Sequence, residues 1–282
     1  MSLIHHRPKL ARDIATQLLN PNVLDQSLRS GLFLSGPRRT GKTTFLLRDL
    51  IPTLENAGAV VIYVDLWSEV TASPSKLVHA ALRSSLKDLQ SSTRNQSRRA
   101  AGVTFDFQVA DLGTPTGATI AQAAVEIVDK VKTDLVYIVD EVQHMLTSDA
   151  GLALLYAFKA ARDAVNARPS TPGHFIFIGT GSNRAQIEGL TVGDKTAFLG
   201  ATSVELPPLG KDYVQWVLQK LQQERVRVIP SLPVASQSFA LLGRRPEEFM
   251  RALSTLQQHQ PLEADQFFPV IAATLQASAE DF

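Results

Sequence analysis

The chain has 282 residues, of which 44% are hydrophobic, and 28 Lys and Arg stand against 27 Asp and Glu, a formal net charge of +1. This length and apolar content suffice for a folded core, which excludes intrinsic disorder as the main state, and the near-zero charge predicts no whole-molecule attraction to nucleic acid or membranes. Cysteine is absent, which excludes disulfides, thiolate metal sites and cysteine nucleophiles.

The first ten residues, MSLIHHRPKL, lack the apolar core of a signal peptide. The apolar runs along the chain are much shorter than the roughly 20 residues that a membrane-spanning helix needs. Together with the absence of cysteine, these features predict a cytoplasmic protein with no membrane attachment.

Short apolar strands alternate with longer helical patterns, which is typical of a parallel sheet with helices on both faces. The predicted strands, each a nearly continuous apolar run, cover residues 32–34, 59–64, 135–139, 174–178 and 202–206. Apolar residues recur every three or four positions over residues 119–132 and 152–165, which predicts two amphipathic helices.

An insertion at about residues 91–113 separates the second and third strands. Its first part, residues 91–100, is polar with three arginines and no acid, which predicts a surface loop. Residues 103–109 (VTFDFQV) alternate strictly between apolar and polar, which predicts a half-solvated edge strand or hairpin arm. Arg94, Arg98 and Arg99 could contact nucleic-acid phosphates, but no aromatic residue interleaves for base stacking, which favours a solvated loop.

Strand patterns stop after Pro207 and Pro208. Helices are predicted at residues 212–226, 234–242, 246–256 and 262–277. The chain is therefore predicted to comprise a core domain, residues 1–207, and a small helical domain, residues 208–282.

A loop directly after the first strand matches the pattern G-x-x-x-x-G-K-S/T and leads into an apolar helical run from Phe45. The loop and its continuation consist of Gly36, Pro37, Arg38, Arg39, Thr40, Gly41, Lys42, Thr43 and Thr44. Such a loop at a helix start supplies converging backbone N–H groups to a phosphate, and its two glycines remove obstructing side chains. Lys42 is then expected at the β- and γ-phosphates, with the Thr43 hydroxyl on Mg²⁺.

Asp140 and Glu141 follow directly on the third strand. Parallel sheets bind ligands at the carboxyl ends of their strands. One carboxylate is needed there to hold Mg²⁺, the role expected of Asp140, and a second to activate the attacking water, the role expected of Glu141. Gln143, two residues further on, either reaches the γ-phosphate region or is simply a polar residue at the start of a loop.

Three segments, FLSGPRRTGKTTFL, YIVDEVQ and IFIGTGSN, resemble in order and spacing the P-loop ATPases of the AAA+ group, in particular the archaeal-type or STAND-like branch. The resemblance implies an α/β P-loop NTPase fold, in which a five-stranded parallel sheet flanked by helices is followed by a helical lid. It also implies an ATPase that uses ATP and Mg²⁺.

The same resemblance implies sensor residues that read the γ-phosphate. Thr180, Ser182 and Asn183 occupy the place of sensor 1, with Asn183 and Ser182 preferred and simple turn chemistry as the alternative. Arg244 and Arg245 occupy the place of sensor 2 in the lid, with a solvated helix cap as the alternative.

The expected arginine finger is not recognisable, because Arg184 begins the helix after sensor 1 and only Lys195 follows it before the fifth strand. Ring assembly is therefore in doubt, and a nucleotide-dependent oligomer stays an open alternative.

Two functions follow from these motifs. The first is Mg²⁺-dependent ATP hydrolysis that drives or gates a conformational change on a macromolecular partner, with a protein favoured over DNA. The alternative is a slowly hydrolysing nucleotide switch or adaptor, conceivably associated with DNA. A small-molecule phosphotransferase is disfavoured because Glu141 provides for water as the acceptor.

Overall fold

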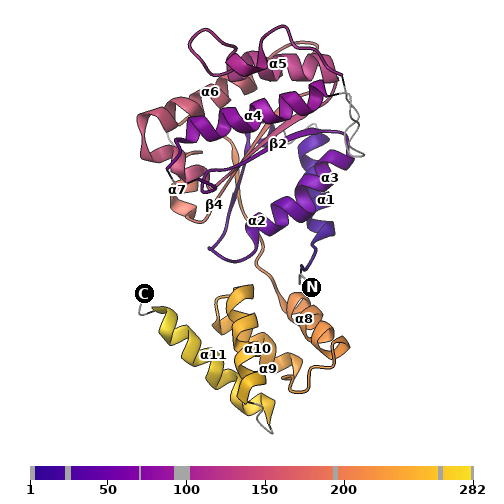
Figure 1. Cartoon of the computed structure of the whole chain (residues 1–282), viewed down its shortest axis with the longest axis vertical. Helices are drawn as coiled ribbons and strands as arrows, with labels where there is room; N and C mark the ends of the chain where they lie inside the picture. The colour runs from indigo at the N-terminus through magenta and orange to yellow at the C-terminus, as the bar shows by residue number, and fades with distance from the viewer. Residues whose placement is uncertain are drawn as a thin grey trace. The chain divides into compact units, whose positions relative to one another are not determined.

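The computed structural model describes residues 4–22, 27–69, 71–91, 102–192, 196–259 and 263–280. It divides into two compact units (Figure 1). The sheet unit comprises Arg7–Ser35 and Phe45–Leu206, and the helical unit comprises Met1–His6, Gly36–Thr44 and Pro207–Phe282. This grouping joins the G-x-x-x-x-G-K-T loop to the C-terminal helices, whereas the predicted division at residue 207 assigned it to the core; that division stays a prediction.

Five parallel strands form one sheet in the order β2-β3-β4-β1-β5. Their bounds are β1 Leu32–Ser35, β2 Val60–Asp65, β3 Leu135–Asp140, β4 Phe175–Gly181 and β5 Thr202–Glu205. All five predicted strands are confirmed. However, β4 continues past residue 178, so that Thr180 lies inside the strand and not after it.

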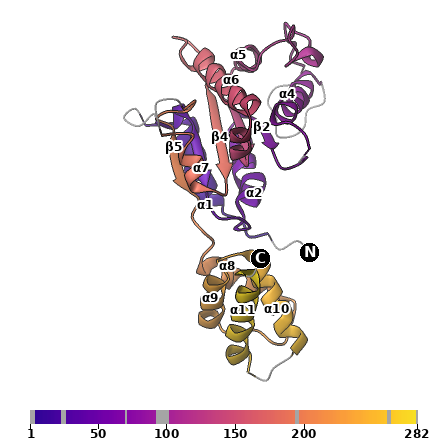
Figure 2. The same ribbon diagram turned by 90° about the vertical axis from the view of Figure 1, so that its left-hand side faces the viewer.

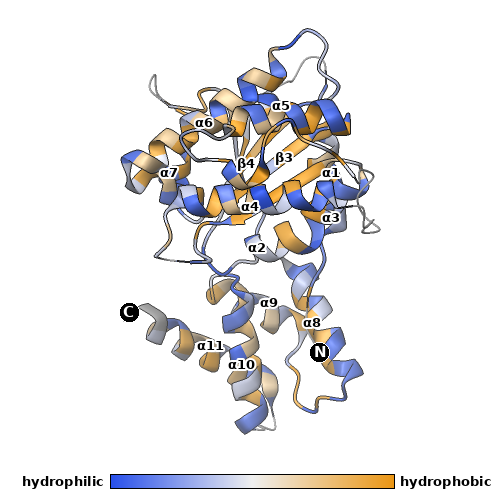
Figure 3. Ribbon diagram, turned by 45° about the horizontal axis from the view of Figure 1, so that its top comes forward, coloured by the Kyte–Doolittle hydropathy of each residue, from blue (hydrophilic) through white to orange (hydrophobic). Residues whose placement is uncertain are grey.

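Helices cover both faces of the sheet. One face packs against α4 (Pro74–Gln90), α5 (Ile120–Val131) and α6 (Asp149–Asn166), through strand residues such as Phe33, Tyr137 and Phe177. The other packs against α1 (Pro8–Leu19), the π-helical turn η2 (Leu46–Leu50) and α3 (Ile51–Asn56), through the alternate strand residues, for example Leu34, Ile138 and Ile178. Figure 3 shows β3 and β4 as mainly hydrophobic. Burial on both faces explains why the strands have continuous apolar sequences.

Local sequence explains the course of several helices. Thr119 and Gln122 form a capping box at the start of α5, and Lys132 ends that helix in the left-handed conformation. The helix that begins with α2 (Lys42–Phe45) widens into η2 before α3. Pro52 has no N–H to donate to the carbonyl four residues earlier, and its ring crowds that carbonyl, so the preceding turn takes π spacing.

The predicted edge strand at residues 103–109 is wrong. The described part of this segment pairs with no strand and ends in the short 3₁₀ turn η3 (Val109–Asp111). Its backbone bonds to helices instead: the N–H of Val103 donates to the Leu89 carbonyl, and Lys130 Nζ donates to the Thr104 carbonyl. The alternate apolar side chains pack on the α4–α5 face, which accounts for the period of two without a partner strand. Arg94, Arg98 and Arg99 lie outside the described residues.

The helical unit contains α8 (Lys211–Gln223), α9 (Leu232–Leu241), α10 (Pro246–His259) and α11 (Ala264–Glu280), which confirms the four predicted helices. Figure 2 shows them side by side. They enclose a core of their own, in which Tyr213, Phe239, Phe249 and Phe268 form a chain of ring contacts. Among the described residues, no helix is both long and apolar enough to span a bilayer.

Candidate functional site

Two of the predicted motifs stand in the chain at the carboxyl ends of parallel strands. β1 ends at Ser35, from which the chain runs directly into the loop of residues 36–41 before α2 begins at Lys42. β3 lies between β2 and β4 in the sheet, and it ends at Asp140. The strand, loop and helix thus follow in the order that a phosphate-binding loop requires.

The loop is folded around the ammonium group of Lys42. Lys42 Nζ donates to the carbonyl oxygens of Gly36 (2.7 Å) and Pro37 (3.0 Å), and Thr40 Oγ1 also donates to the Pro37 carbonyl (2.8 Å). Gly41 has a φ of +90°, which side chains disfavour, and Arg39 has a φ of 62°. The loop therefore curls into a turn with its lysine placed across it.

This loop fits a triphosphate with Mg²⁺ in its chemistry. An ammonium group that donates to two neutral carbonyls next to a helix start is suited to an anion. Thr43 is exposed immediately after Lys42, and its hydroxyl is a hard oxygen donor of the kind that Mg²⁺ takes together with a carboxylate, water and phosphate oxygens.

Asp140 is buried at the end of β3, with 1% of its surface exposed. Three groups donate to its carboxylate: Thr180 Oγ1 and the Glu141 N–H (3.1 Å) to Oδ1, and the Tyr63 hydroxyl (3.2 Å) to Oδ2. A buried carboxylate needs hydrogen-bond partners to offset the loss of water. These donors fix the position of the Asp140 carboxylate at this edge.

The groups around Asp140 show its electrostatic influence. Burial, and then the carboxylates of Asp140 and Asp65, raise the pKa of Tyr63 well above its usual range, so that its hydroxyl keeps the proton it donates. Burial is also the main cause that raises the pKa of Asp65, and the neighbouring charges of Asp140 and Glu141 add to it. The edge is thus markedly electronegative, which suits a divalent cation.

Glu141 occupies an unusual backbone conformation. Its φ of 56° and ψ of 44° are left-handed, and it leads into the 3₁₀ turn η4 (Val142–Thr147). Gln143, which is 7% exposed, donates from its Nε2 to Glu141 Oε2. Strain of this kind is concentrated at functional sites.

The structure separates the three candidates for sensor 1. Thr180 lies in β4 and bonds directly to Asp140. Asn183 instead caps α7 (Arg184–Glu188), because its side chain accepts from the Gln186 N–H (3.2 Å), while Ser182 lies between them, partly buried. The sequence favours Asn183 and Ser182 over Thr180 because the predicted strand ends at residue 178, three residues before the end of β4. The small residues up to Gly181 were the available signal.

Arg244 and Arg245 lie between α9 and α10 in the helical unit. Arg244 has a φ of 54°, and its guanidinium lies 3.5 Å from the Leu209 carbonyl. In the same unit, Arg39 of the loop faces two acids at the start of α10, Glu247 (3.9 Å) and Glu248 (3.8 Å). Sequence reasoning missed Glu248, which nothing in its local pattern distinguishes from a solvated helix residue.

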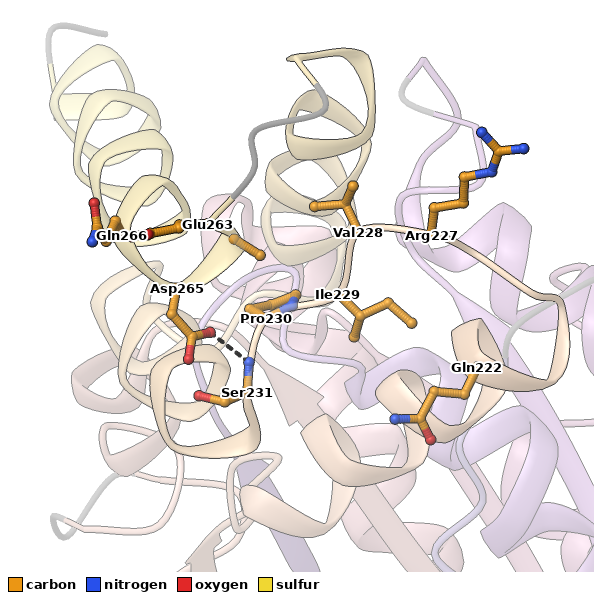
Figure 4. Close-up of a pocket in the computed structure, with 10 residues that line it drawn as sticks. Gln222, Arg227, Val228, Ile229, Pro230, Ser231, Glu263, Asp265 and Gln266 are labelled. Atoms are coloured by element: carbon orange, nitrogen blue, oxygen red, sulfur yellow. Dashed lines mark hydrogen bonds between the residues drawn. The ribbon is translucent and has the colours of Figure 1, made fainter.

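A separate cavity of about 710 Å³ lies in the helical unit (Figure 4). It is bounded by Gln222 and by residues 227–231 and 263–266. Asp265 there accepts a hydrogen bond from the Ser231 N–H (2.6 Å). None of the predicted site residues lines this cavity.

Comparison with known families identifies the chain. A family model described as AAA domain matches residues 25–187, more than half of the sequence. The chain belongs to the AAA domain family. This membership confirms the predicted relationship to AAA+ P-loop ATPases, whose shared chemistry is nucleotide binding and hydrolysis. No curated protein matches the chain in sequence.

Solved structures confirm the fold. The Aeropyrum pernix Orc1 protein in complex with DNA is 16% identical, with a TM-score of 0.53, over 96% of this chain and 65% of that one. The A. pernix Orc2 protein in its ADPNP-ADP complexes is 14% identical, with a TM-score of 0.57, over 98% and 70%. Cdc6p from Pyrobaculum aerophilum is 14% identical, with a TM-score of 0.50, over 93% and 65%. The chain thus spans less than two thirds of the Orc1 and Cdc6p chains.

Proposed function

We propose that this AAA-family chain binds ATP with Mg²⁺ and hydrolyses it to ADP and phosphate. The observation that carries the proposal is the pairing of two motifs on one sheet: a loop curled around a lysine ammonium after β1, and a buried aspartate followed by a glutamate after β3. Phosphoryl transfer requires positioning and charge stabilisation of this kind.

Each motif has a distinct role in the proposed reaction. Lys42 and the backbone amides of residues 36–44 hold the phosphates, and the Thr43 hydroxyl and Asp140 are the oxygen donors for the metal. When bound, Mg²⁺ neutralises charge on the β- and γ-phosphate oxygens. Glu141 takes a proton from water as the water oxygen bonds to the γ-phosphorus. The bond from that phosphorus to the bridging oxygen breaks, and ADP leaves.

Two further sets of residues are proposed to report the γ-phosphate. Thr180, Ser182 and Asn183 end or follow β4 and can donate near the reacting phosphate. Arg244 and Arg245 belong to the helical unit together with the loop, and an arginine there can pair with a phosphate. The nucleotide state would then be passed to the helical unit and so to a macromolecular partner.

A slowly hydrolysing switch is the second candidate, and one observation favours it. Arg184, the arginine nearest to the place of an arginine finger, is engaged by acids of its own chain, Glu188 (2.7 Å) and Glu205 (3.7 Å). An arginine finger contributes about 10³- to 10⁵-fold in phosphoryl transfer. Without one, basal turnover would be slow.

Calorimetry and a steady-state ATPase assay test the main proposal. Lys42→Ala is expected to abolish ATP binding in Mg²⁺ buffer and, with it, turnover. Lys159→Ala, which removes the same charge from a surface pair on α6, is the matched control and should bind as the wild type does. No ATP uptake by the wild-type chain, or normal uptake by Lys42→Ala, contradicts the proposal.

The partner is tested in the same assay. We expect a partner protein to alter turnover and single-stranded DNA to leave it unchanged, because no aromatic residue interleaves with the arginines of residues 91–100 for base stacking. Stimulation by DNA alone would replace the protein partner with DNA. Light scattering with and without ATP and Mg²⁺ measures any nucleotide-dependent assembly.

A further inference from the structure

Gln143 is buried near Asp140 and Glu141 at the carboxyl end of β3, a region that we call the acidic edge. The roles proposed above do not use Gln143. Its side chain lies beside Glu141, to which its amide nitrogen donates. The accepting atom is a carboxylate oxygen, so the amide nitrogen, and not the amide oxygen, faces Glu141. The orientation of the Gln143 amide is therefore determined by its neighbour.

The amide oxygen of Gln143 is buried and has no hydrogen-bond partner among the described residues. A buried, unpaired acceptor is destabilising, because no hydrogen bond replaces the water that it has lost. The nitrogen of the same amide does have a partner, Glu141. Such an unpaired atom in a folded protein calls for an explanation, and a donor that arrives with the substrate provides one.

Gly181 defines where this oxygen lies. A Cβ on Gly181 would collide with Gln143 Oε1, so the missing side chain of this glycine leaves room for the amide at the end of β4. Gly181 pairs in register with Ser35, the last residue of β1 before the phosphate-binding loop. Gln143 Oε1 is therefore on the part of the sheet edge from which that loop departs.

The chemistry of the attacking water explains both halves of this amide. Water that attacks phosphorus points a lone pair at it and needs acceptors for both of its hydrogens. Glu141 supplies one acceptor, and the second must lie close beside it. The Gln143 amide holds Glu141 by its nitrogen, and the oxygen of the same amide group is unpaired.

We propose that Gln143 and Glu141 together position the attacking water. Gln143 Nε2 orients the Glu141 carboxylate, and Gln143 Oε1 accepts the second hydrogen of the water. This inference rests on the hydrolytic function proposed above. One water O–H bond breaks, and its proton goes to Glu141; the other hydrogen stays on the oxygen, bonded to Gln143, as the new P–O bond forms. Gln143 itself neither gains nor loses a proton.

Kinetics of Gln143→Met test the proposal, because Met has a similar length and volume but neither an amide donor nor an acceptor. We expect kcat to fall by about 100-fold, the usual cost of a misplaced reactant. The ATP dissociation constant should change by less than about threefold, because the phosphates are held elsewhere. Gln143→Met combined with Glu141→Gln should be no slower than Glu141→Gln alone, because both changes disable the same water.

Gly181→Ala provides a second perturbation that leaves the Gln143 residue in place. The added methyl group must displace the amide, so kcat should fall as in Gln143→Met while ATP binding persists. Gly189→Ala is the matched control, because the nearest atom to its new Cβ would be 3.4 Å away, an ordinary contact. Near-UV circular dichroism verifies that each variant keeps its tertiary structure, and Gly181→Ala decides the question if Gln143→Met unfolds.

The outcomes separate this inference from the function on which it rests. If the wild type hydrolyses ATP and Glu141→Gln stops it, but Gln143→Met retains the wild-type kcat, only the role of Gln143 is overturned. The same holds if the two changes lower kcat independently. If the wild type does not hydrolyse ATP, or Glu141→Gln turns over normally, the proposed function fails and the role of Gln143 falls with it.

Discussion

The phosphate-binding loop and the acidic edge are built in opposite ways. The loop residues Pro37, Arg38 and Arg39 are exposed, and the loop is held by bonds between its own lysine and its own carbonyls. At the acidic edge, Asp140, Thr180 and Gln143 are buried, and side chains from three strands interlock. A backbone cradle tolerates side-chain change, whereas an interlocked buried network does not. Substitutions should therefore affect function alone in the loop, and function and stability together at the edge.

Strained backbone conformations occur in both regions. Five non-glycine residues have positive φ among the described ranges. Two of them, Lys132 and Arg225, end helices, where the left-handed conformation is common. The other three, Arg39, Glu141 and Arg244, are residues for which a role in nucleotide binding or hydrolysis is proposed above. Each such residue costs about 1 to 3 kcal/mol, which the structure around it has to offset.

The largest effect is expected for Glu141→Gln. Removal of the general base should lower kcat by about 10² to 10⁴, while ATP binding persists because the loop is intact. Glu69→Gln, which changes an exposed carboxylate paired with Lys76, serves as the control and should retain the wild-type kcat. Single-turnover hydrolysis of labelled ATP measures the effect, and equal turnover of both variants would remove Glu141 from its role.

Thr180→Val sharpens the contrast in stability. The change keeps the shape but removes a donor to the buried carboxylate of Asp140, so the free energy of unfolding should fall by about 1 to 3 kcal/mol. Thr43→Val, in the exposed loop, should change it by less than about 0.5 kcal/mol. Trp67 and Thr180 lie in the sheet unit, and Trp216 and Thr43 lie in the helical unit. Urea denaturation followed by Trp67 fluorescence in a Trp216→Phe background therefore measures Thr180→Val, and denaturation followed by Trp216 fluorescence in a Trp67→Phe background measures Thr43→Val. If both variants lost the same free energy of unfolding, the contrast between the loop and the acidic edge would be wrong.

A smaller effect is expected where the loop meets the start of α10 in the helical unit. A double-mutant cycle of Arg39→Ala and Glu248→Gln should give a coupling free energy of about 0.2 to 1 kcal/mol, because the Arg39 side chain is 63% exposed and the pair is long. The coupling should weaken in high salt. Glu247→Gln, an exposed neighbour, is the control and should couple less. Denaturation followed by Trp216 fluorescence provides the values.

The smallest effect concerns pH. Because the pKa of Asp65 is raised in the folded chain, the native state binds a proton more tightly than the unfolded state does, and stability falls as the pH rises through that raised pKa. Asp65→Asn keeps an acceptor for the Trp67 N–H and removes the charge. It should raise the melting temperature at pH 7 by about 1 to 2 °C, and the gain should vanish as the pH falls toward 3.8. Asp13→Asn, on the exposed side of α1, should show no such trend.

Local patterns determined much of this protein from the sequence by itself. The five strands follow from apolar runs, the ends of α5 follow from Thr119 and Lys132, and the loop follows from its two glycines and Lys42. In each case the physical cause, such as burial on both faces, a cap or a φ preference, acts between residues close together in the chain. These features can therefore be predicted from the sequence.

Tertiary structure decided the rest. Residues 103–109 carry the alternation of a strand, but helices supply the partners for their backbone. Asp140 bonds to Thr180 and not to the preferred Asn183, and Gln143 meets Gly181 at the end of β4. These contacts join residues tens of positions apart, and they exist only because parallel strands bring their carboxyl ends to one edge. Local sequence carries no record of such neighbours, since they are created by the pairing of the strands.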